Sequence, residues 1–337
     1  MTGFMRLIGQ QRPVRMLCNA LINGSMPHAL LFTGEDGVGK ATAAIEIAKV
    51  CNCTGIPGSQ KAQKDTAPEQ HFAACGICRS CRKIEHGTHP DFHVIKPAGA
   101  YIRIDQIREL CGRLALKSDE ASSRFVLIAD AHLMNPEAGN ALLKILEEPP
   151  AATFFVLTAP DTQDLLPTIV SRCRHVRFNP IPQKELAEYL GRSCGLDNEN
   201  AAIIASLARG SLARALEMAS EDWMTRRNFI IQRLCQLPQQ PTAYRLAFAE
   251  MLAADKEKLE VIFEIMKNWY RDLAVFDHFP EHIYNQDLRQ QIHSAREHES
   301  LETILEKSDA IDRAQKALSS NANVRLALDV LVMELAE

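Results

Sequence analysis

The chain has 337 residues, of which 46% are hydrophobic and 24% charged, and its formal net charge is −4. This length exceeds one ordinary hydrophobic core and predicts two or three domains, while the composition excludes long disorder and a fibrous repeat. Because no apolar run approaches the roughly 18 residues that span a bilayer, and the N-terminus lacks signal-peptide features, we expect a cytoplasmic protein that does not bind membranes.

The first 180 residues alternate short apolar runs with helical patterns, which favours a parallel sheet covered by helices. The predicted strands are Ala29–Thr33, Phe92–Ile95, Phe125–Ala129, Phe154–Thr158 and His175–Phe178. The predicted helices between them are Ala41–Val50, Ile104–Leu116 and Pro136–Glu147. A polar stretch at Gly55–His71, rich in Gly, Pro and Lys, interrupts the scheme and is interpreted as a mobile insertion.

After about Pro182 the strand signals end and only helical patterns remain. Short helices are expected over Gln183–Gly191 and within Asn198–Ala219, and longer ones from Glu221 onward. An apolar stripe on Leu259–Leu273 suits either an internal core or packing against partner subunits. The last predicted helix is Val324–Leu335, with Asn321 and Asn323 as candidate N-caps. We therefore predict an α/β domain at 1–180, a small helical domain at 181–220 and an all-helical domain at 221–337.

A candidate phosphate-binding loop, Gly34-Glu-Asp-Gly-Val-Gly-Lys40, follows the first predicted strand and precedes a helix. Gly34, Gly37 and Gly39 allow the backbone amides to surround an anion, and Lys40 would reach the phosphates of ATP or ADP. The next residue is normally Ser or Thr, whose hydroxyl holds Mg²⁺, but here it is Ala41, with Thr42 one position late. Nucleotide binding is thus expected without competent Mg²⁺ chemistry, and the alternative is a glycine-rich turn with no ligand.

The strand Phe125–Ala129 ends in Asp130, the usual acidic partner of such a loop. Hydrolytic members follow this Asp with a Glu that orients water, whereas this chain has Ala131. Alone the match is weak, because Asp commonly follows a strand in a turn. Together with the glycine loop it indicates a phosphate-loop domain whose catalytic chemistry is degraded.

Three cysteines, Cys75, Cys78 and Cys81, share the close spacing of a metal-binding knuckle. Tetrahedral Zn²⁺ needs four ligands, and Cys53, across the polar insertion, is the preferred fourth. Cys51, His71 and His86 remain alternatives for that place. The pattern predicts a structural zinc site within an insertion at about 51–86. The remaining cysteines are interpreted as core residues, namely Cys18, Cys111, Cys173, Cys194 and Cys235.

The cysteine knuckle between a phosphate loop and the next strand, with the segments Asn140–Pro150 and Leu166–Cys173, resembles bacterial DNA polymerase III clamp-loader subunits of the AAA+ class. Residues 5–220 carry the resemblance closely, and Asn321–Leu328 is similar to the final collar helix of that family. The resemblance implies a P-loop α/β domain, a helical lid at 181–220 and a helical collar at 221–337.

Within the family, the delta-prime subunit is a stator and other members are ATP-hydrolysing motors. Ala41, Ala131 and Ala213 replace three residues that the motor would use, which favours delta-prime and no independent ATPase activity. Ser171-Arg172-Cys173 is similar to the motif whose arginine reaches a neighbour's γ-phosphate, so Arg172 is the expected trans-acting arginine finger. Thr158 resembles the first sensor position of the nucleotide site.

The resemblance also implies an accessory subunit of a DNA polymerase holoenzyme that helps to load the sliding clamp. The expected partners are gamma/tau-like motor subunits and a delta-like subunit in a heteropentamer, the clamp itself, and primer–template DNA contacted without sequence preference. Two alternatives remain: the ATP-hydrolysing motor of the same assembly, and a stand-alone zinc-containing DNA-binding module.

Overall fold

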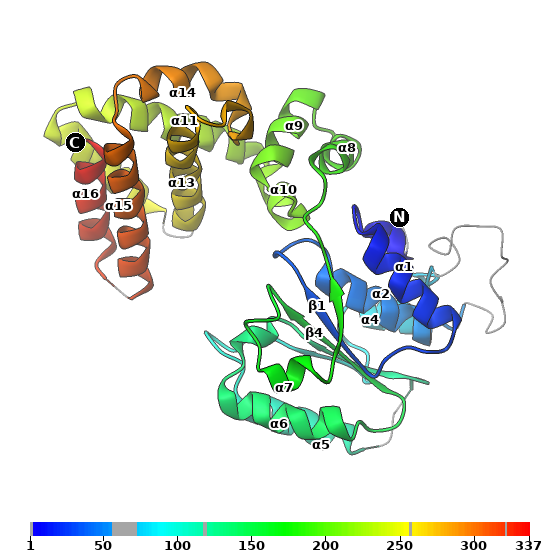
Figure 1. Cartoon of the computed structure of the whole chain (residues 1–337). Helices are drawn as coiled ribbons and strands as arrows, with labels where there is room; N and C mark the ends of the chain where they lie inside the picture. The colour runs from blue at the N-terminus through cyan, green and yellow to red at the C-terminus, as the bar shows by residue number, and fades with distance from the viewer. Residues whose placement is uncertain (1–2, 56–72, 117–119, 256–257, 321) are drawn as a thin grey trace. The chain divides into compact units, whose positions relative to one another are not determined.

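The computed structural model describes residues 3–55, 73–116, 120–255, 258–320 and 322–337. The predicted insertion at Gly55–His71 falls almost entirely outside them, as do the alternative ligand His71 and the candidate cap Asn321. The chain divides into two compact units (Figure 1). Unit 1 comprises Met1–Leu186 with Arg209–Arg214, and unit 2 comprises Ala187–Ala208 with Ala215–Glu337. The predicted boundaries between lid and collar stay a prediction.

The described residues of unit 1 form one parallel sheet of five strands in the order β2-β3-β4-β1-β5. The strands are β1 (Ala29–Thr33), β2 (Phe92–Ile95), β3 (Arg124–Ile128), β4 (Thr153–Ala159) and β5 (Arg174–Arg177). The three central strands, β1, β3 and β4, are almost wholly buried, as expected of strands covered on both faces. The sequence prediction of a parallel α/β sheet is thereby confirmed, with strand ends shifted by one residue at β3, β4 and β5.

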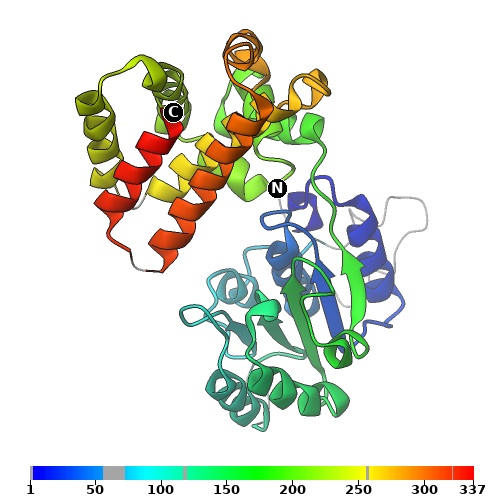
Figure 2. The same ribbon diagram turned by 60° about the vertical axis from the view of Figure 1, so that its left-hand side comes forward.

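Alternate side chains of the central strands divide the core into two layers. One layer joins Leu30, Phe32 and Val156 to the helices α1 and α2. The other joins Leu31, Val126 and Leu157 to α5, α6 and α7. Figures 1 and 2 show α1 and α2 on one side of the sheet and α5 and α6 on the other.

The three predicted helices of unit 1 are present: α6 has the predicted bounds, α2 extends beyond both of its predicted ends, and α5 ends two residues earlier than predicted. The longer ones are α1 (Gln11–Ile22), α2 (Lys40–Asn52), α5 (Ile104–Leu114) and α6 (Pro136–Glu147), and the shorter ones are η1 (Gly3–Arg6), α4 (Arg79–Glu85), η2 (Ala131–Leu133) and α7 (Pro167–Val170). The side chain of Asn135 caps α6 by accepting from the amide of Ala138 (2.9 Å), and Pro149 follows its end. These signals explain why the predicted and observed bounds of α6 coincide.

The rest of the chain is helical among the described residues. Its α-helices are α8 (Gln183–Cys194), α9 (Asn198–Leu207), α10 (Leu212–Met218), α11 (Glu221–Gln236), α12 (Thr242–Ala254), α13 (Leu259–Val275), α14 (Arg289–Arg296), α15 (Leu301–Ser319) and α16 (Val324–Leu335), with short turns η3 (Leu237–Gln239), η5 (Pro280–His282) and η6 (Gln286–Leu288). Asn323 caps α16 as predicted, because its Oδ1 accepts from the amide of Leu326 at 3.2 Å. The parallel sheet followed by helices confirms the predicted fold class.

The apolar stripe on α13 is buried within unit 2. Its members pack against α11 and α15 and lie at most 7% exposed: Leu259, Ile262, Phe263, Met266, Trp269, Tyr270 and Leu273. The stripe therefore belongs to the core of this chain. Of the two alternatives that the sequence allowed, an internal core and packing against partner subunits, the structure supports the first.

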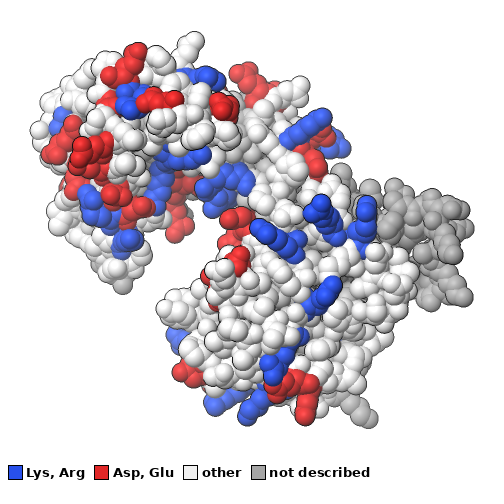
Figure 3. Space-filling view, in the orientation of Figure 1, with Lys and Arg blue, Asp and Glu red and all other residues white. Residues whose placement is uncertain are grey.

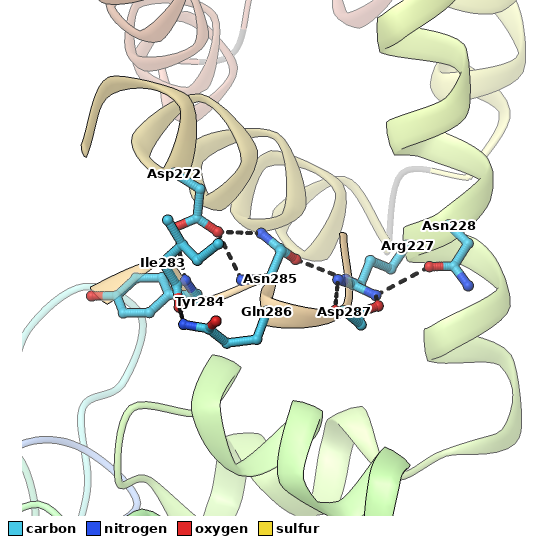
Figure 4. A network of polar contacts seen from close by, with 8 residues as sticks. All are labelled: Arg227, Asn228, Asp272, Ile283, Tyr284, Asn285, Gln286 and Asp287. Carbon is cyan, nitrogen blue, oxygen red and sulfur yellow. Dashed lines mark hydrogen bonds and ion pairs between the residues drawn. The ribbon is translucent and has the colours of Figure 1, made fainter. Parts of the chain in front are cut away.

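A buried polar network fixes the segment that follows α13 (Figure 4). Asp272, fully buried, accepts hydrogen bonds from the amides of Tyr284 (2.9 Å) and Asn285 (2.8 Å) and from the side chain of Asn285 (2.7 Å). Asn285 in turn accepts from Arg227 on α11 (2.9 Å), whose guanidinium also contacts both carboxylate oxygens of Asp287. Every buried charge in this chain of contacts thus has a partner, which is the condition for burying it at tolerable cost.

Candidate functional site

The carboxyl ends of the strands bring the predicted nucleotide residues to one edge of the sheet. Thr158 lies on β4, between β1, which precedes the glycine loop, and β3, which precedes Asp130. The Thr158 hydroxyl accepts a hydrogen bond from the amide of Asp130 (3.0 Å), and the amide of Gly34 donates to the carbonyl of Pro160 (3.0 Å). The three parts of the predicted nucleotide site therefore lie on neighbouring strands.

The glycine loop adopts backbone conformations that favour glycine. Gly34, Gly37 and Gly39 have φ values of 139°, 79° and 104°. A side chain on Gly34 would meet the carbonyl oxygen of Phe178 at 2.3 Å, so this residue allows β5 and the loop to approach closely. The loop then leads into α2, whose first residue is Lys40.

Lys40 is bonded to its own loop. Its ammonium donates to the carbonyls of Gly34 and Glu35 (3.0 Å for the latter) and contacts the Asp36 carboxylate at 3.2 Å. The residue is 6% exposed. These contacts satisfy the Lys40 charge within its own loop.

The residues after Lys40 and Asp130 offer no catalytic groups. Ala41 is exposed at the start of α2, and Ala131 is buried in the core beneath the sheet. Asp130 itself is in the left-handed region with φ 53° and precedes η2. The positions that would carry the Mg²⁺-binding hydroxyl and the water-orienting carboxylate are both methyl groups.

A turn at the start of α10 packs on the glycine loop. The amide of Leu212 donates to the carbonyl of Gly37 (3.0 Å), and a side chain on Gly37 would meet Ser211 Oγ at 2.2 Å and Ala213 Cβ at 2.7 Å. Ala213, rather than Arg214, thus faces the loop. This contact could not be predicted from the sequence, because it joins segments that are far apart in the chain.

Arg172 follows the short helix α7 and is partly exposed, with 35% of its side chain accessible. Its Nη1 donates to the carbonyl of Thr168 (3.0 Å), and its Nη2 forms an ion pair with Glu147 at the end of α6. Glu147 is a partner that the sequence reading did not identify.

The four predicted cysteines converge. The sulfur atoms of Cys53, Cys75, Cys78 and Cys81 all lie within 4.8 Å of one another, so Cys53 joins the three closely spaced cysteines from a separate segment of the chain. Four thiolates about 2.3 Å from one tetrahedral Zn²⁺ would be about 3.8 Å apart, so the group fits a metal of this size. Cys51 and His86 lie outside this cluster.

Backbone amides prepare the sulfurs to be negatively charged. The amides of Cys75, Cys78 and Cys81 point at the sulfurs of Cys53 (3.3 Å), Cys75 (3.3 Å) and Cys78 (3.4 Å) respectively. The amide of Cys78 is the main reason that the pKa of Cys75 is lowered. Burial works against ionisation of Cys78, but hydrogen bonds from Cys81 and Thr54 outweigh it and lower the pKa of Cys78 to about 5. Burial raises the pKa of Cys81 and so favours its protonated thiol. A cation at the centre of the cluster would favour the thiolate instead, and all four sulfurs could then be ligands.

A buried ion-pair group joins the cysteine segment to α2. Lys49 and Glu46 on α2 are both at most 4% exposed and lie 3.0 Å apart, and Lys49 also pairs with Glu85 at the end of α4. Arg6 contacts Glu46 (3.2 Å) and Glu85 (3.0 Å). The helix that carries Cys81 is therefore held to the helix that begins at the glycine loop.

The other cysteines divide by exposure. Cys18 is buried and Cys111 and Cys173 are half-buried, but Cys194 and Cys235 are exposed. The expectation of core positions is wrong for the last two, because α8 and α11 turn them toward solvent. Burial raises the pKa of Cys51 to about 12, as suits a thiol on α2 that packs against the core.

Charge on the surface is mixed. In the view of Figure 3, groups of Lys and Arg lie among Asp, Glu and wide uncharged areas. On that face the described residues do not form one continuous basic surface. Among the described residues, no helix is long and apolar enough to cross a membrane.

Comparison with known proteins places these features in one family. Residues 9–182 match the model of "DNA polymerase III, delta subunit", and residues 220–337 match that of "DNA polymerase III, delta subunit, C terminal". The chain is 29% identical to DNA polymerase III subunit delta' of Bacillus subtilis (strain 168), over 97% of this chain and 96% of that protein. It is 31% identical to subunit delta' of Escherichia coli (strain K12), over 62% and 58% of the two chains.

Gamma subunits are also similar. The chain is 29% identical to DNA polymerase III subunit gamma of Buchnera aphidicola subsp. Schizaphis graminum (strain Sg), over 83% of this chain and 77% of that one. A solved gamma subunit-related protein from Thermotoga maritima aligns over 96% and 98% of the chains at 18% identity, with a TM-score of 0.45. Since one family model covers more than half of the sequence and a second covers its C-terminal part, the chain belongs to the DNA polymerase III delta-subunit family, as a delta-prime-like clamp-loader subunit.

Proposed function

We propose that this subunit acts as a stator: it hydrolyses no ATP itself and supplies Arg172 to the nucleotide site of a neighbouring motor subunit. The observation that carries the proposal is the contrast between the chain's own nucleotide site and Arg172. Ala41 and Ala131 place methyl groups at both catalytic positions of the chain's own nucleotide site, while Arg172 follows α7 and is partly exposed. A guanidinium placed in trans stabilises the charge that develops on a transferred phosphoryl group.

The partners follow from the same proposal. Gamma/tau-like motors would bind beside Arg172, a delta-like subunit would complete the heteropentamer, and the assembly would open a sliding clamp at primer–template DNA. DNA contact would go mainly to phosphates and would weaken with salt. The resemblance of unit 2 to the C-terminal family model supports a collar role for residues 220–337.

The proposal assigns a structural role to zinc. Cys53, Cys75, Cys78 and Cys81 would hold it, and four thiolates would fill its tetrahedral coordination. A closed site of this kind leaves no position for substrate, so the metal would stabilise the fold of the cysteine segment. ATP or ADP would bind the Gly34–Lys40 loop only by replacing the contacts that Lys40 makes with its own loop.

The first test is ATP hydrolysis by the purified chain, with and without primed DNA. A stator gives no turnover. DNA-stimulated turnover that Lys40→Ala abolishes would instead support the motor function, which the similarity to gamma subunits keeps as the second candidate. Specific DNA affinity of the isolated chain, without any effect on motor subunits, would favour the stand-alone module.

The second test is reconstitution of the clamp loader with Arg172→Ala. The finger role predicts a large loss of ATPase activity, by analogy with the ~10³–10⁵-fold effect of arginine fingers elsewhere, with assembly unchanged. Arg174→Ala is a matched control, since Arg174 is an exposed arginine two residues away on β5. Equal activity of the Arg172 variant and the unsubstituted complex would refute the assignment.

A further inference from the structure

Glu147 and Arg172 meet at the junction of α6 and α7. Arg172 Nη2 donates to Glu147 Oε1, and the two side chains are 35% and 50% exposed. Glu147 is the last residue of α6, at the point where Pro149 prevents the helix from continuing. Its place in space is therefore set by a helix end that is anchored in the core through Leu142 and Leu146.

The helix that precedes Arg172, α7, holds the arginine from a second side. Nη1 donates to the carbonyl of Thr168 (3.0 Å) and lies 3.5 Å from Ser171 Oγ, which itself donates to the same carbonyl at 3.0 Å. The helix α7 packs closely on α6, because a side chain on Gly139 would meet Leu166 at 2.9 Å (Figure 1). Thr168 on α7 therefore holds Nη1 of the guanidinium group, and Glu147 on α6 holds Nη2.

The contacts leave part of the guanidinium available. The group has five N–H donors, and the bonds to Thr168, Ser171 and Glu147 use three of them. The donors that remain are enough for the oxygens of a phosphate. Glu147 and a phosphate can thus be bound by Arg172 at the same time, without one replacing the other.

We propose that Glu147 is a positioning residue for Arg172: it holds the guanidinium in the orientation that meets a neighbouring subunit's γ-phosphate. This inference rests on the proposed finger role of Arg172. A flexible arginine on the surface would lose conformational freedom each time it met the phosphate, whereas an arginine already held in place loses less. Because both side chains are exposed, the contribution of Glu147 lies in orientation and not in stability of the fold.

The test uses the reconstituted clamp loader with Glu147→Ala, Glu147→Gln, Glu148→Ala and Arg172→Ala in this chain. Glu147→Ala should lower kcat for ATP several-fold, less than Arg172→Ala, with KM for ATP nearly unchanged. Glu147→Gln keeps a side-chain oxygen at the same place and should retain more activity than the alanine variant. Glu148 is exposed and is the next residue in the chain, so Glu148→Ala should leave activity unchanged.

A double variant separates positioning from a merely structural role. Glu147→Ala combined with Arg172→Ala should be no worse than Arg172→Ala alone, since Glu147 acts only through the arginine. Additive losses would overturn the inference, and so would higher activity of Glu147→Ala, which would show that Glu147 restrains the finger. If Arg172→Ala lowers activity and Glu147→Ala does not, the finger role stands and the positioning role falls. If Arg172→Ala has no effect, both fail.

Discussion

The amide of Leu212 donates a hydrogen bond to the carbonyl oxygen of Gly37 at 3.0 Å. This bond joins the start of α10 to the centre of the glycine loop. Ser211 and Ala213 consequently occupy the space into which a side chain on Gly37 would point. The glycine loop and the segment Arg209–Arg214 thus pack together within unit 1. Gly37 is required there for both its conformation and its size.

Replacing Gly37 with alanine should destabilise unit 1. The residue has a φ of 79°, and the added methyl group would meet Ser211 Oγ at 2.2 Å. The left-handed backbone costs about 1–2 kcal/mol, and the steric conflict adds about 1–3 kcal/mol. Gly24→Ala is the control, since Gly24 also has a positive φ but open space around it, and it should cause only the smaller backbone loss. Calorimetric unfolding of both variants measures the difference; equal losses would mean that the Ser211 turn does not pack on the loop.

Removal of the metal should release and destabilise the cysteine segment. The purified chain should contain one zinc ion, and Cys75→Ser should lose it, because three thiolates and a hydroxyl bind zinc more weakly than four thiolates. Cys51→Ser should retain the ion, since Cys51 lies outside the cluster. Metal content by atomic emission and the thermal midpoint with and without a chelator give the two readouts. Loss of zinc in the Cys51 variant with retention in Cys53→Ser would reverse the ligand assignment.

Acid should destabilise unit 1 through two histidines, His89, which is buried, and His93, which is half-buried. Burial is the main cause that lowers the pKa of His89 and also that of His93. The folded chain therefore resists protonation of these rings, while the unfolded chain accepts protons near pH 6.5. Stability should be full above about pH 6.5 and should fall as the pH drops from there through the lowered folded pKa values.

Substitution of His89 measures how much this residue contributes to the loss of stability in acid. His89 Nδ1 accepts from the amide of Asp91 (3.1 Å), so His89→Asn keeps a side-chain group near this amide without a titrating ring. The variant should show a shallower decline of unfolding free energy between about pH 6.5 and pH 5. An unchanged slope, measured by denaturant unfolding at fixed zinc concentration, would assign the acid sensitivity to other groups.

Loss of the Asp272 carboxylate should strongly destabilise unit 2. Asp272→Ala would leave the amides of Tyr284 and Asn285 and the Asn285 side chain without their acceptor in a buried place (Figure 4). Removal of one partner from such a network costs about 3–5 kcal/mol. Tryptophan fluorescence during urea unfolding reports this unit selectively, because the chain has two tryptophans, Trp223 on α11 and Trp269 on α13. Asp309→Ala, at an exposed site on α15, should change stability by less than about 0.5 kcal/mol.

The sequence determined the local structure of this protein to a large extent. Short apolar runs predicted the five strands within one residue at each end, and helical patterns predicted α6 and α16 without error, because caps and a proline mark those helix ends. The glycines, Lys40 and the cysteine spacing pointed to phosphate and metal chemistry through the residue types alone. These features depend on residues that are close together in the chain, so a single sequence is enough to predict them.

Only the tertiary structure decided which distant residues meet. It placed Cys53, and not Cys51, among the clustered thiols, and it paired Arg172 with Glu147. It assigned the α13 stripe to the core of its own unit, and it turned Cys194 toward solvent. The spacing of hydrophobic residues shows that one face of a helix is buried, but it does not show which element covers that face. The sequence around a charged side chain likewise does not identify its ion-pair partner. Those choices follow from the packing of whole helices against the sheet and against one another, where many weak contacts act together.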